Sequence, residues 1–218
     1  MNMPAVANEL ANPFAGTTKA VSMGTTIASC VYDQGVILCA DTRTSAGQYV
    51  ANRVSKKISK ITDTIFICRS GSAADTQALA DLVKRYLQDH MLETNEPARV
   101  KTAARLLQLV AYNNRGYLSA GMIIGGVDDL GPHVFVIPLG GSLYEQPYAL
   151  GGSGSSYVLG MARATHQETF THEQCEQWLI TLVSRAMESD GSSGGVIRLV
   201  TIPTDGPVTA RYLESPIE

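Results

Sequence analysis

Long apolar runs and an excess of one charge are both missing from this sequence. No segment approaches the roughly 20 consecutive apolar residues of a membrane-spanning helix. A net charge of −3 over 218 residues gives no reason to expect nucleic acid as a partner. Residues 1–24 lack the basic start and the continuous apolar stretch of a secretory signal. With 44% hydrophobic and 17% charged residues, the chain is expected to be a soluble globular protein that binds neither membrane nor nucleic acid.

Cysteine is scarce and carries no metal or redox spacing. The four cysteines, Cys30, Cys39, Cys68 and Cys175, form no CxxC pair, the arrangement typical of zinc and thioredoxin-like sites. Three of them lie within β-prone apolar runs, where a free thiol behaves as a small buried hydrophobe. We therefore expect buried free thiols, no bound metal, and a reducing compartment, namely the cytoplasm and nucleus.

Internal repeats and low-complexity linkers are also absent, and strands and helices instead alternate in groups. Apolar β-prone runs predict strands, apolar residues at helical spacing predict helices, and Thr171 opens the Thr-x-x-Gln pattern of a capping box. Expected strands cover 26–32, 36–40, 49–57, 64–68, 122–126, 133–138, 195–202 and 208–213, and expected helices cover about 75–90, 97–113, 156–166 and 171–187. This order suggests an α+β domain in which two facing antiparallel sheets lie between outer helix pairs.

The dipeptide Gly24-Thr25 joins a patternless leader to the first strand-like run. If the bond between them is cleaved, Thr25 presents a hydroxyl nucleophile together with its own α-amine, whose pKa of about 7.7–8.0 lets it accept a proton near neutral pH. Gly24 places no side-chain bulk in the way of an attack by that hydroxyl on its carbonyl carbon. The pattern predicts a leader of residues 1–24 that is removed by self-cleavage and a catalytic domain of residues 25–218. Taken alone, the dipeptide would be an ordinary entry into a strand.

Seven stretches downstream of the leader resemble catalytic beta subunits of the eukaryotic 20S proteasome. They are GTT at 24–26, GVILCADTR at 35–43, NRVSKK at 52–57, RSGSAAD at 69–75, IPLGG at 137–141, GSGS at 152–155 and DGSSGG at 190–195. Each stretch alone is a weak signal, but their order and spacing together are specific and extend over nearly all of the chain after the leader. The resemblance implies the N-terminal nucleophile hydrolase fold, a four-layer α-β-β-α sandwich, and a threonine peptidase that works by acyl transfer.

The resemblance also assigns catalytic roles. Thr25 would be the nucleophile, and Asp41 and Lys57 the charged pair beneath it, since an ammonium close to a hydroxyl eases loss of its proton while a carboxylate orients the lysine. Taken alone, Asp41 would be a polar strand end and Lys57 a solvated lysine. Lys56 adds an ambiguity, because the family usually has a single lysine here. Strand alternation would place Lys56 and Lys57 on opposite faces, and the motif register favours Lys57.

Four further residues match positions around the reacting atoms. Gly71 would stabilise the tetrahedral oxyanion through its backbone N–H, although it would otherwise be a plain turn glycine before a helix. Ser153, Asp190 and Ser193 would surround the new amine and tune its protonation. Without the resemblance, these three would be loop residues beside glycine-rich turns.

Arg69 is the residue that the resemblance connects with specificity. It ends an otherwise apolar strand two residues before Gly71, at the position that lines the pocket for the side chain preceding the cleaved bond. An arginine there should favour acidic side chains, as in the caspase-like type of beta subunit, whereas taken alone it would be a snorkelling surface arginine. The other pocket positions match small or polar residues, which leave room for a carboxylate: Thr44, Ser45, Ser55, Ser59, Ala73 and Gln77.

Partners follow from the resemblance as well. It implies stacked seven-membered rings with other beta subunits and with alpha subunits, regulatory caps at the alpha rings, unfolded and typically ubiquitin-targeted protein substrates, and no cofactor. Two alternatives stay open at this point. One is an unprocessed, non-catalytic ring subunit of the same particle, although such members typically lack the threonine or its lysine. The other is a bacterial-type self-compartmentalising peptidase or another N-terminal nucleophile amidase.

Overall fold

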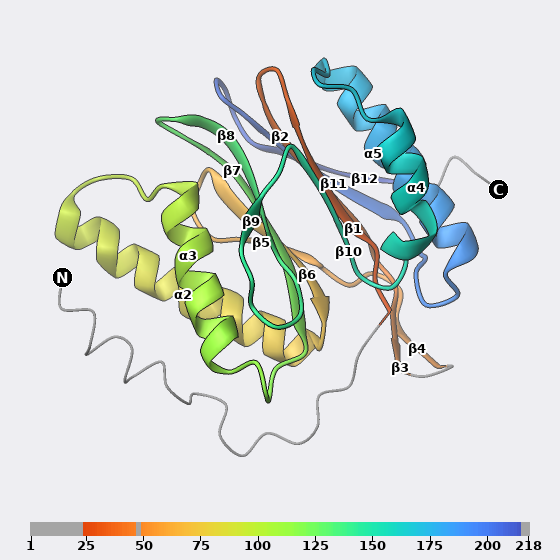
Figure 1. Cartoon of the computed structure of the whole chain (residues 1–218), viewed down its shortest axis with the longest axis horizontal. Coiled ribbons are helices and arrows are strands. Elements are labelled where there is room, and N and C mark those ends of the chain that lie inside the picture. Colours follow the sequence, from red (N-terminus) through yellow and green to blue (C-terminus); the bar gives the residue numbers. More distant parts are fainter. Residues whose placement is uncertain (1–23, 47–48, 215–218) are drawn as a thin grey trace.

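Two five-stranded antiparallel sheets stack face to face in the computed structural model, which describes residues 24–46 and 49–214 (Figure 1). The first sheet has the order β10 (Tyr148–Gly151), β1 (Ile27–Tyr32), β2 (Gly35–Asp41), β11 (Ile197–Pro203) and β12 (Thr209–Leu213). The second has the order β5 (Ile58–Lys60), β6 (Ile65–Gly71), β7 (Ala120–Asp128), β8 (Gly131–Ile137) and β9 (Tyr144–Glu145). A short ribbon pairs β3 (Thr44–Ala46) with β4 (Tyr49–Asn52).

Helix pairs cover the two outer faces. Helices α2 (Ala73–Thr94) and α3 (Val100–Asn113) pack on the second sheet, and α4 (Ser155–Thr165) and α5 (His172–Ser189) pack on the first. The predicted α+β sandwich of two sheets between helix layers is therefore confirmed. None of the helices within the described residues is long and apolar enough to cross a membrane.

The central strands are apolar on both faces because each sheet lies between a helix pair and the other sheet. In β2, Ile37 and Cys39 pack toward α5, while Val36 and Leu38 pack between the sheets. Side chains of a strand alternate between its two faces, so a strand covered on both sides becomes a continuous apolar run. This is the pattern that predicted the strand at 36–40.

Local signals at helix starts are also confirmed. Thr171 caps α5 with the complete predicted box, because its hydroxyl accepts from the backbone of Gln174 while the Gln174 side chain accepts from the backbone of Thr171. Ser72 caps α2 in a similar way by accepting from the Asp75 N–H. All four cysteines are buried free thiols, as predicted.

The prediction of a single strand over 49–57 is wrong. Strand β4 ends at Asn52, whose side-chain oxygen accepts from the Val54 N–H at 2.9 Å and so offers the backbone a turn in place of a strand ladder. The carbonyl of Arg53 accepts from the Thr42 hydroxyl at 2.7 Å, and the Ser55 N–H donates to the Thr42 carbonyl at 2.9 Å. The segment is therefore fixed to the end of β2 and resumes as the short strand β5.

Helix ends and the shortest strands also differ from the prediction. Helix α2 continues to Thr94, and α3 begins at Val100, whose N–H donates to the Asp128 side chain at 2.8 Å. Strands β3, β9 and β10 have two to four residues each, too few to show a periodic pattern. The predicted leader lies outside the described residues except for Gly24.

Candidate active site

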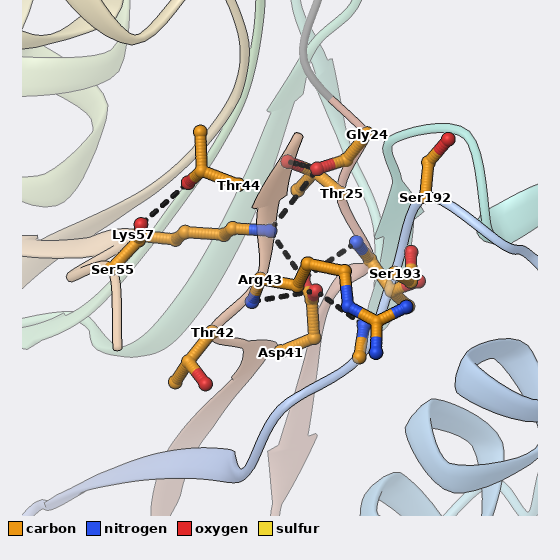
Figure 2. A network of polar contacts seen from close by, with 12 residues as sticks. Gly24, Thr25, Asp41, Thr42, Arg43, Thr44, Ser55, Lys57, Ser192 and Ser193 are labelled. Carbon is orange, nitrogen blue, oxygen red and sulfur yellow. Dashed lines mark hydrogen bonds and ion pairs between the residues drawn. The ribbon is translucent and has the colours of Figure 1, made fainter. Parts of the chain in front are cut away.

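Thr25 lies just before β1 and is almost completely buried. In this structure its peptide bond to Gly24 is intact. The Thr25 hydroxyl donates to the Gly24 carbonyl oxygen at 2.7 Å, and the Lys57 ammonium donates to the same oxygen at 3.2 Å. Figure 2 shows both groups directed at this one carbonyl. A nucleophile and a cation therefore meet at the bond that the sequence predicts to be cleaved.

Gly24 is packed so tightly that only glycine fits. A Cβ added there would lie 1.8 Å from the Cβ of Ser192, far inside van der Waals contact. The missing side chain thus lets the leader carbonyl approach the loop that follows α5. This close approach is a specific use of glycine.

Asp41 and Lys57 form a buried ion pair of 2.6 Å, with relative side-chain exposures of 0% and 7%. The Asp41 carboxylate also accepts from the backbone N–H groups of Thr26 at 2.9 Å, Gly194 at 3.0 Å and Arg43 at 3.2 Å. Burial is the largest influence on both groups: it raises the pKa of the Asp41 carboxyl and lowers the pKa of the Lys57 ammonium, and their mutual attraction opposes both shifts. Lys57, and not the exposed Lys56, makes this pair.

A second polar chain holds the Thr25 nitrogen. The Thr25 N–H donates to the Ser153 hydroxyl at 3.2 Å, and Ser153 donates to Asp190 at 2.6 Å. From the other side, Ser193 donates to the same Asp190 oxygen at 2.6 Å and lies 2.7 Å from the Thr26 hydroxyl. The structure thus brings Ser153, Asp190 and Ser193 together beside Thr25, from loops more than 30 residues apart in sequence.

The Asp190 carboxyl is held in its ionised form. Burial acts to raise its pKa, but hydrogen bonds from Ser153, Ser193 and the Ser192 N–H, together with the charge of Lys57, hold the pKa of Asp190 below its usual range. A depressed folded-state pKa stabilises the fold above the unfolded value of about 3.9 and loses that contribution as the pH falls through the folded value.

Replacing this carboxylate gives a pH-dependent prediction. Asp190→Asn should lower the free energy of unfolding by about 1–3 kcal/mol at neutral pH, since hydrogen bonds to a charged acceptor are lost. The difference from wild type should shrink once the pH falls below about 3.9 and through the folded-state pKa. Thermal unfolding midpoints of both proteins across this pH range would test it. A difference that stays constant with pH would contradict the ionised state assigned to Asp190.

Gly71 lies where two hollows meet at the end of β6. Its φ is +100°, and a Cβ added there would lie 2.3 Å from the Ser119 carbonyl oxygen. It lines a cavity of about 550 Å³ that also includes Thr25, and a second, mostly apolar hollow of about 460 Å³ toward Ser153. Both the positive φ and the close contact require glycine.

The larger cavity holds most of the residues that the resemblance assigns to substrate binding. Those that line it are Thr44, Ser55, Arg69, Ala73 and Gln77. Ser45 and Ser59 do not line it: Ser45 is buried in β3, and Ser59 pairs with Ile67, two residues along β6 from Arg69. Five further residues, which the resemblance assigns no role in the site, also line it: Asn52, Lys56, Ser70, Ala74 and Thr76.

Arg69 is anchored by uncharged oxygens. Its Nη2 donates to the Lys56 carbonyl at 2.8 Å, and its Nη1 lies 3.4 Å from both the Ala73 carbonyl and the Thr76 hydroxyl. Among the described residues no carboxylate pairs with it. Its positive charge is therefore available to a ligand in the cavity.

Sequence reasoning also missed the contacts that fix the loop after α5. A Cβ at Gly194 would lie 2.4 Å from the Arg43 guanidinium carbon, and a Cβ at Gly195, where φ is +83°, would lie 2.4 Å from the Thr42 hydroxyl oxygen. Thr42 and Arg43 both donate their N–H groups to the Gly194 carbonyl, at 3.1 and 3.0 Å. The adjacent glycines were the available signal, because paired glycines often mark a close backbone approach.

Comparison with known proteins shows the family to which the sequence belongs. Residues 21–202 match the family described as "Proteasome subunit". The chain is 48% identical over 186 residues to proteasome subunit beta type-6 of Arabidopsis thaliana, covering 85% of this chain and 80% of the relative. It is 49% identical over 187 residues to the probable proteasome subunit beta type-1 of Schizosaccharomyces pombe, with coverages of 85% and 83%. Against proteasome subunit beta type-1 of Saccharomyces cerevisiae, the identity is 43% over 187 residues, with coverages of 85% and 86%. The chain therefore belongs to the proteasome subunit family, as a beta-type member.

Proposed function

We propose that this chain is a threonine endopeptidase subunit of the 20S core that activates itself by cleaving the Gly24–Thr25 bond. The observation that carries the proposal is the convergence of the Thr25 hydroxyl and the Lys57 ammonium on the Gly24 carbonyl oxygen, at 2.7 and 3.2 Å. The ammonium polarises the carbonyl and stabilises the negative charge that develops on its oxygen during attack. Asp41 keeps that cation in place from beneath.

Self-cleavage then proceeds in two steps, transfer of the acyl group to the hydroxyl and hydrolysis of the resulting ester. The Thr25 oxygen attacks the Gly24 carbonyl carbon, the C–N bond breaks, the nitrogen gains the hydroxyl proton, and an ester joins Gly24 to the Thr25 side chain. Water hydrolyses the ester, which releases the leader with a carboxylate at Gly24 and restores the hydroxyl. Thr25 then has a free α-amine within reach of Ser153 and Asp190.

The mature site repeats this acyl transfer on a peptide substrate. The α-amine accepts the Thr25 hydroxyl proton and later donates it to the leaving amine, while the Lys57 ammonium stabilises the alkoxide. The Gly71 N–H stabilises the tetrahedral oxyanion. Water hydrolyses the acyl-enzyme and regenerates the threonine. The ionised Asp190, acting through Ser153, orients the amine and favours its ability to take up a proton.

The cavity beside Thr25 accommodates the side chain that precedes the cleaved bond, and Arg69 gives it a preference for acidic residues. Arg69 has no ion-pair partner within the described residues, and apart from Lys56 and Lys57 the remaining lining is small or polar. A charge-assisted hydrogen bond to a glutamate or aspartate side chain is worth about 1.5–3 kcal/mol, or about ten- to a hundredfold in preference. This is a caspase-like specificity.

Replacing Arg69 tests the assignment. Arg69→Met keeps the apolar stem but removes the charge, so kcat/KM for reporter peptides ending in glutamate should fall by about ten- to a hundredfold, while cleavage after leucine should rise or stay the same. Arg185→Met, which removes an exposed arginine on α5 paired with Glu188, is the matched control. An unchanged ratio of glutamate to leucine cleavage in Arg69→Met would contradict the acidic preference.

The same proposal covers partners and location. The chain assembles with other beta subunits and with alpha subunits in stacked seven-membered rings, which enclose the nucleophile so that only unfolded polypeptides reach it. Regulatory caps at the alpha rings deliver those substrates, which are typically ubiquitin-targeted. Four buried free cysteines suit a reducing compartment, the cytoplasm and nucleus. N-terminal sequencing of the mature chain tests the proposal directly, because an intact leader would favour a non-catalytic ring subunit.

A further inference from the structure

The cavity beside Thr25 carries two positive charges that no ion pair within the described residues neutralises, and Asp81 acts on Arg69 only from beyond ion-pair distance. Lys56 and Arg69 both line it, and no aspartate or glutamate does. Lys57 also lines it, but Asp41 balances that charge at 2.6 Å. Within residues 24–46 and 49–214, neither Lys56 nor Arg69 takes part in an ion pair. One singly charged carboxylate would balance only half of this charge.

The guanidinium of Arg69 is held beside the backbone of Lys56. Arg69 Nη2 donates to the carbonyl of Lys56 at 2.8 Å, which fixes the guanidinium beside this residue. Lys56 itself is exposed, and an ammonium on a flexible four-carbon stem can reach over a cavity that its residue lines. Lys56 lies in the irregular stretch 53–57 between β4 and β5, which is not in a strand.

The remaining lining suits an anion with several acceptor oxygens. The hydroxyls of Thr44 and Ser55 lie 2.5 Å apart, and both residues line the cavity, as does Thr76. A volume of about 550 Å³ exceeds what a carboxylate needs. A phosphate monoester carries about −1.5 to −2 charges near neutral pH and three strong acceptor oxygens, and arginine and lysine together recognise it as a bidentate fork and a point charge.

We propose that this cavity takes the side chain of phosphoserine, and that Lys56 is the specificity-determining residue that distinguishes it from glutamate. The inference rests on the proposed peptidase function and specifies its substrate class. Cleavage then occurs after a phosphorylated residue in an unfolded polypeptide, with Arg69 binding either anion and Lys56 matching the second charge.

The test uses assembled particles that contain the wild-type chain or Lys56→Gln. Three coumarin-amide reporter peptides differ only in the residue before the cleaved bond: phosphoserine, glutamate or serine. In wild type, kcat/KM should be highest for phosphoserine, and Lys56→Gln should lower that value by about tenfold while lowering the glutamate value only about two- to threefold. Lys56→Arg should restore the phosphoserine preference. The ratio of phosphoserine to glutamate cleavage should also fall below about pH 6, where the phosphate gains a proton.

Controls separate this inference from the function on which it rests. Lys60→Gln removes an equal charge from an exposed lysine outside the cavity and should leave the three reporters in their wild-type order. Loss of all Thr25-dependent cleavage after glutamate would reject the peptidase function itself. Normal glutamate cleavage with phosphoserine cleaved no faster than serine would overturn the inference alone. If Lys56→Gln lowered kcat/KM equally for phosphoserine and glutamate, the inference would also be overturned. That result is expected if a neighbouring subunit neutralises Lys56 in the assembled ring.

Discussion

Particles that carry Thr25→Ala are expected to retain the leader on this chain and to lose cleavage after acidic residues by about three to six orders of magnitude. The hydroxyl that makes the 2.7 Å contact to the Gly24 carbonyl is absent in this variant. No attack on that carbonyl can therefore begin, and no free α-amine is produced at position 25. The nucleophile and its base are lost together by one substitution.

Two measurements check this expectation. Mass spectrometry of the chain from purified particles reports the leader, and an acidic-ended reporter peptide gives the activity. Thr25→Ser keeps a hydroxyl on the same carbon and should process and cleave, with reduced rates. Thr94→Ala, at the exposed end of α2, controls for the loss of a threonine elsewhere. Full acidic cleavage by Thr25→Ala particles would contradict the role given to this residue.

The layers of the fold were predictable because each rests on a local pattern. Apolar runs such as 36–40 indicated strands covered on both faces, and the Thr171 box indicated where α5 begins. The strand over 49–57 was mispredicted because the Asn52 side chain and the Thr42 contacts decide that segment. Those contacts come from tertiary structure, which a residue pattern does not contain.

In the candidate site, too, some residues could be predicted from the sequence, while others are positioned by tertiary contacts. Thr25, Asp41 and Lys57 could be named from a resemblance, but no spacing rule places residues 16 apart at 2.6 Å. The Arg43 contact with Gly194 and the position of Lys56 in the cavity depend on loops that meet only in the folded chain. In the sequence, Lys56 stands out only as a rival of Lys57. Its place in the cavity depends on the backbone path over 53–57, which a residue pattern does not specify.

The Asp41–Lys57 pair is expected to be essential for activity and expendable for folding. Burial raises the folded-state pKa of Asp41. Asp41 therefore adds to the free energy of unfolding below its unfolded-state pKa of about 3.9, and this contribution is lost as the pH rises through the folded-state pKa. Burial lowers the folded-state pKa of Lys57. Lys57 therefore adds to the free energy of unfolding above its unfolded-state pKa of about 10.4, and this contribution is lost as the pH falls through the folded-state pKa. At neutral pH, burial therefore makes both charges costly to the fold.

Substitutions that break or remove this pair test the expectation, because the double variant should recover stability but not activity. Lys57→Met leaves a buried carboxylate without its cation, and Asp41→Asn leaves a buried ammonium without its anion, so each should lower the free energy of unfolding by about 3–5 kcal/mol. The double variant removes both charges and should return to within about 1–2 kcal/mol of wild type. All three should lose cleavage after acidic residues. Lys57→Met and the double variant remove the cation at the Thr25 site, and Asp41→Asn removes the carboxylate that keeps this cation charged and oriented.

Unfolding must be compared where processing cannot differ, so each variant is made on the Thr25→Ala background, which keeps the leader on every chain. Urea unfolding then reports stability, and reporter cleavage is measured in parallel with Thr25 restored. The exposed pair Lys60–Asp63, at 2.8 Å, is the matched control, and Lys60→Met with Asp63→Asn should barely move the urea midpoint. If the double variant lost as much free energy of unfolding as the two single variants added together, the pair would be required for folding, and the expectation would be wrong. Recovered stability without recovered cleavage instead identifies a charge pair that the fold tolerates because the reaction at Thr25 requires its cation.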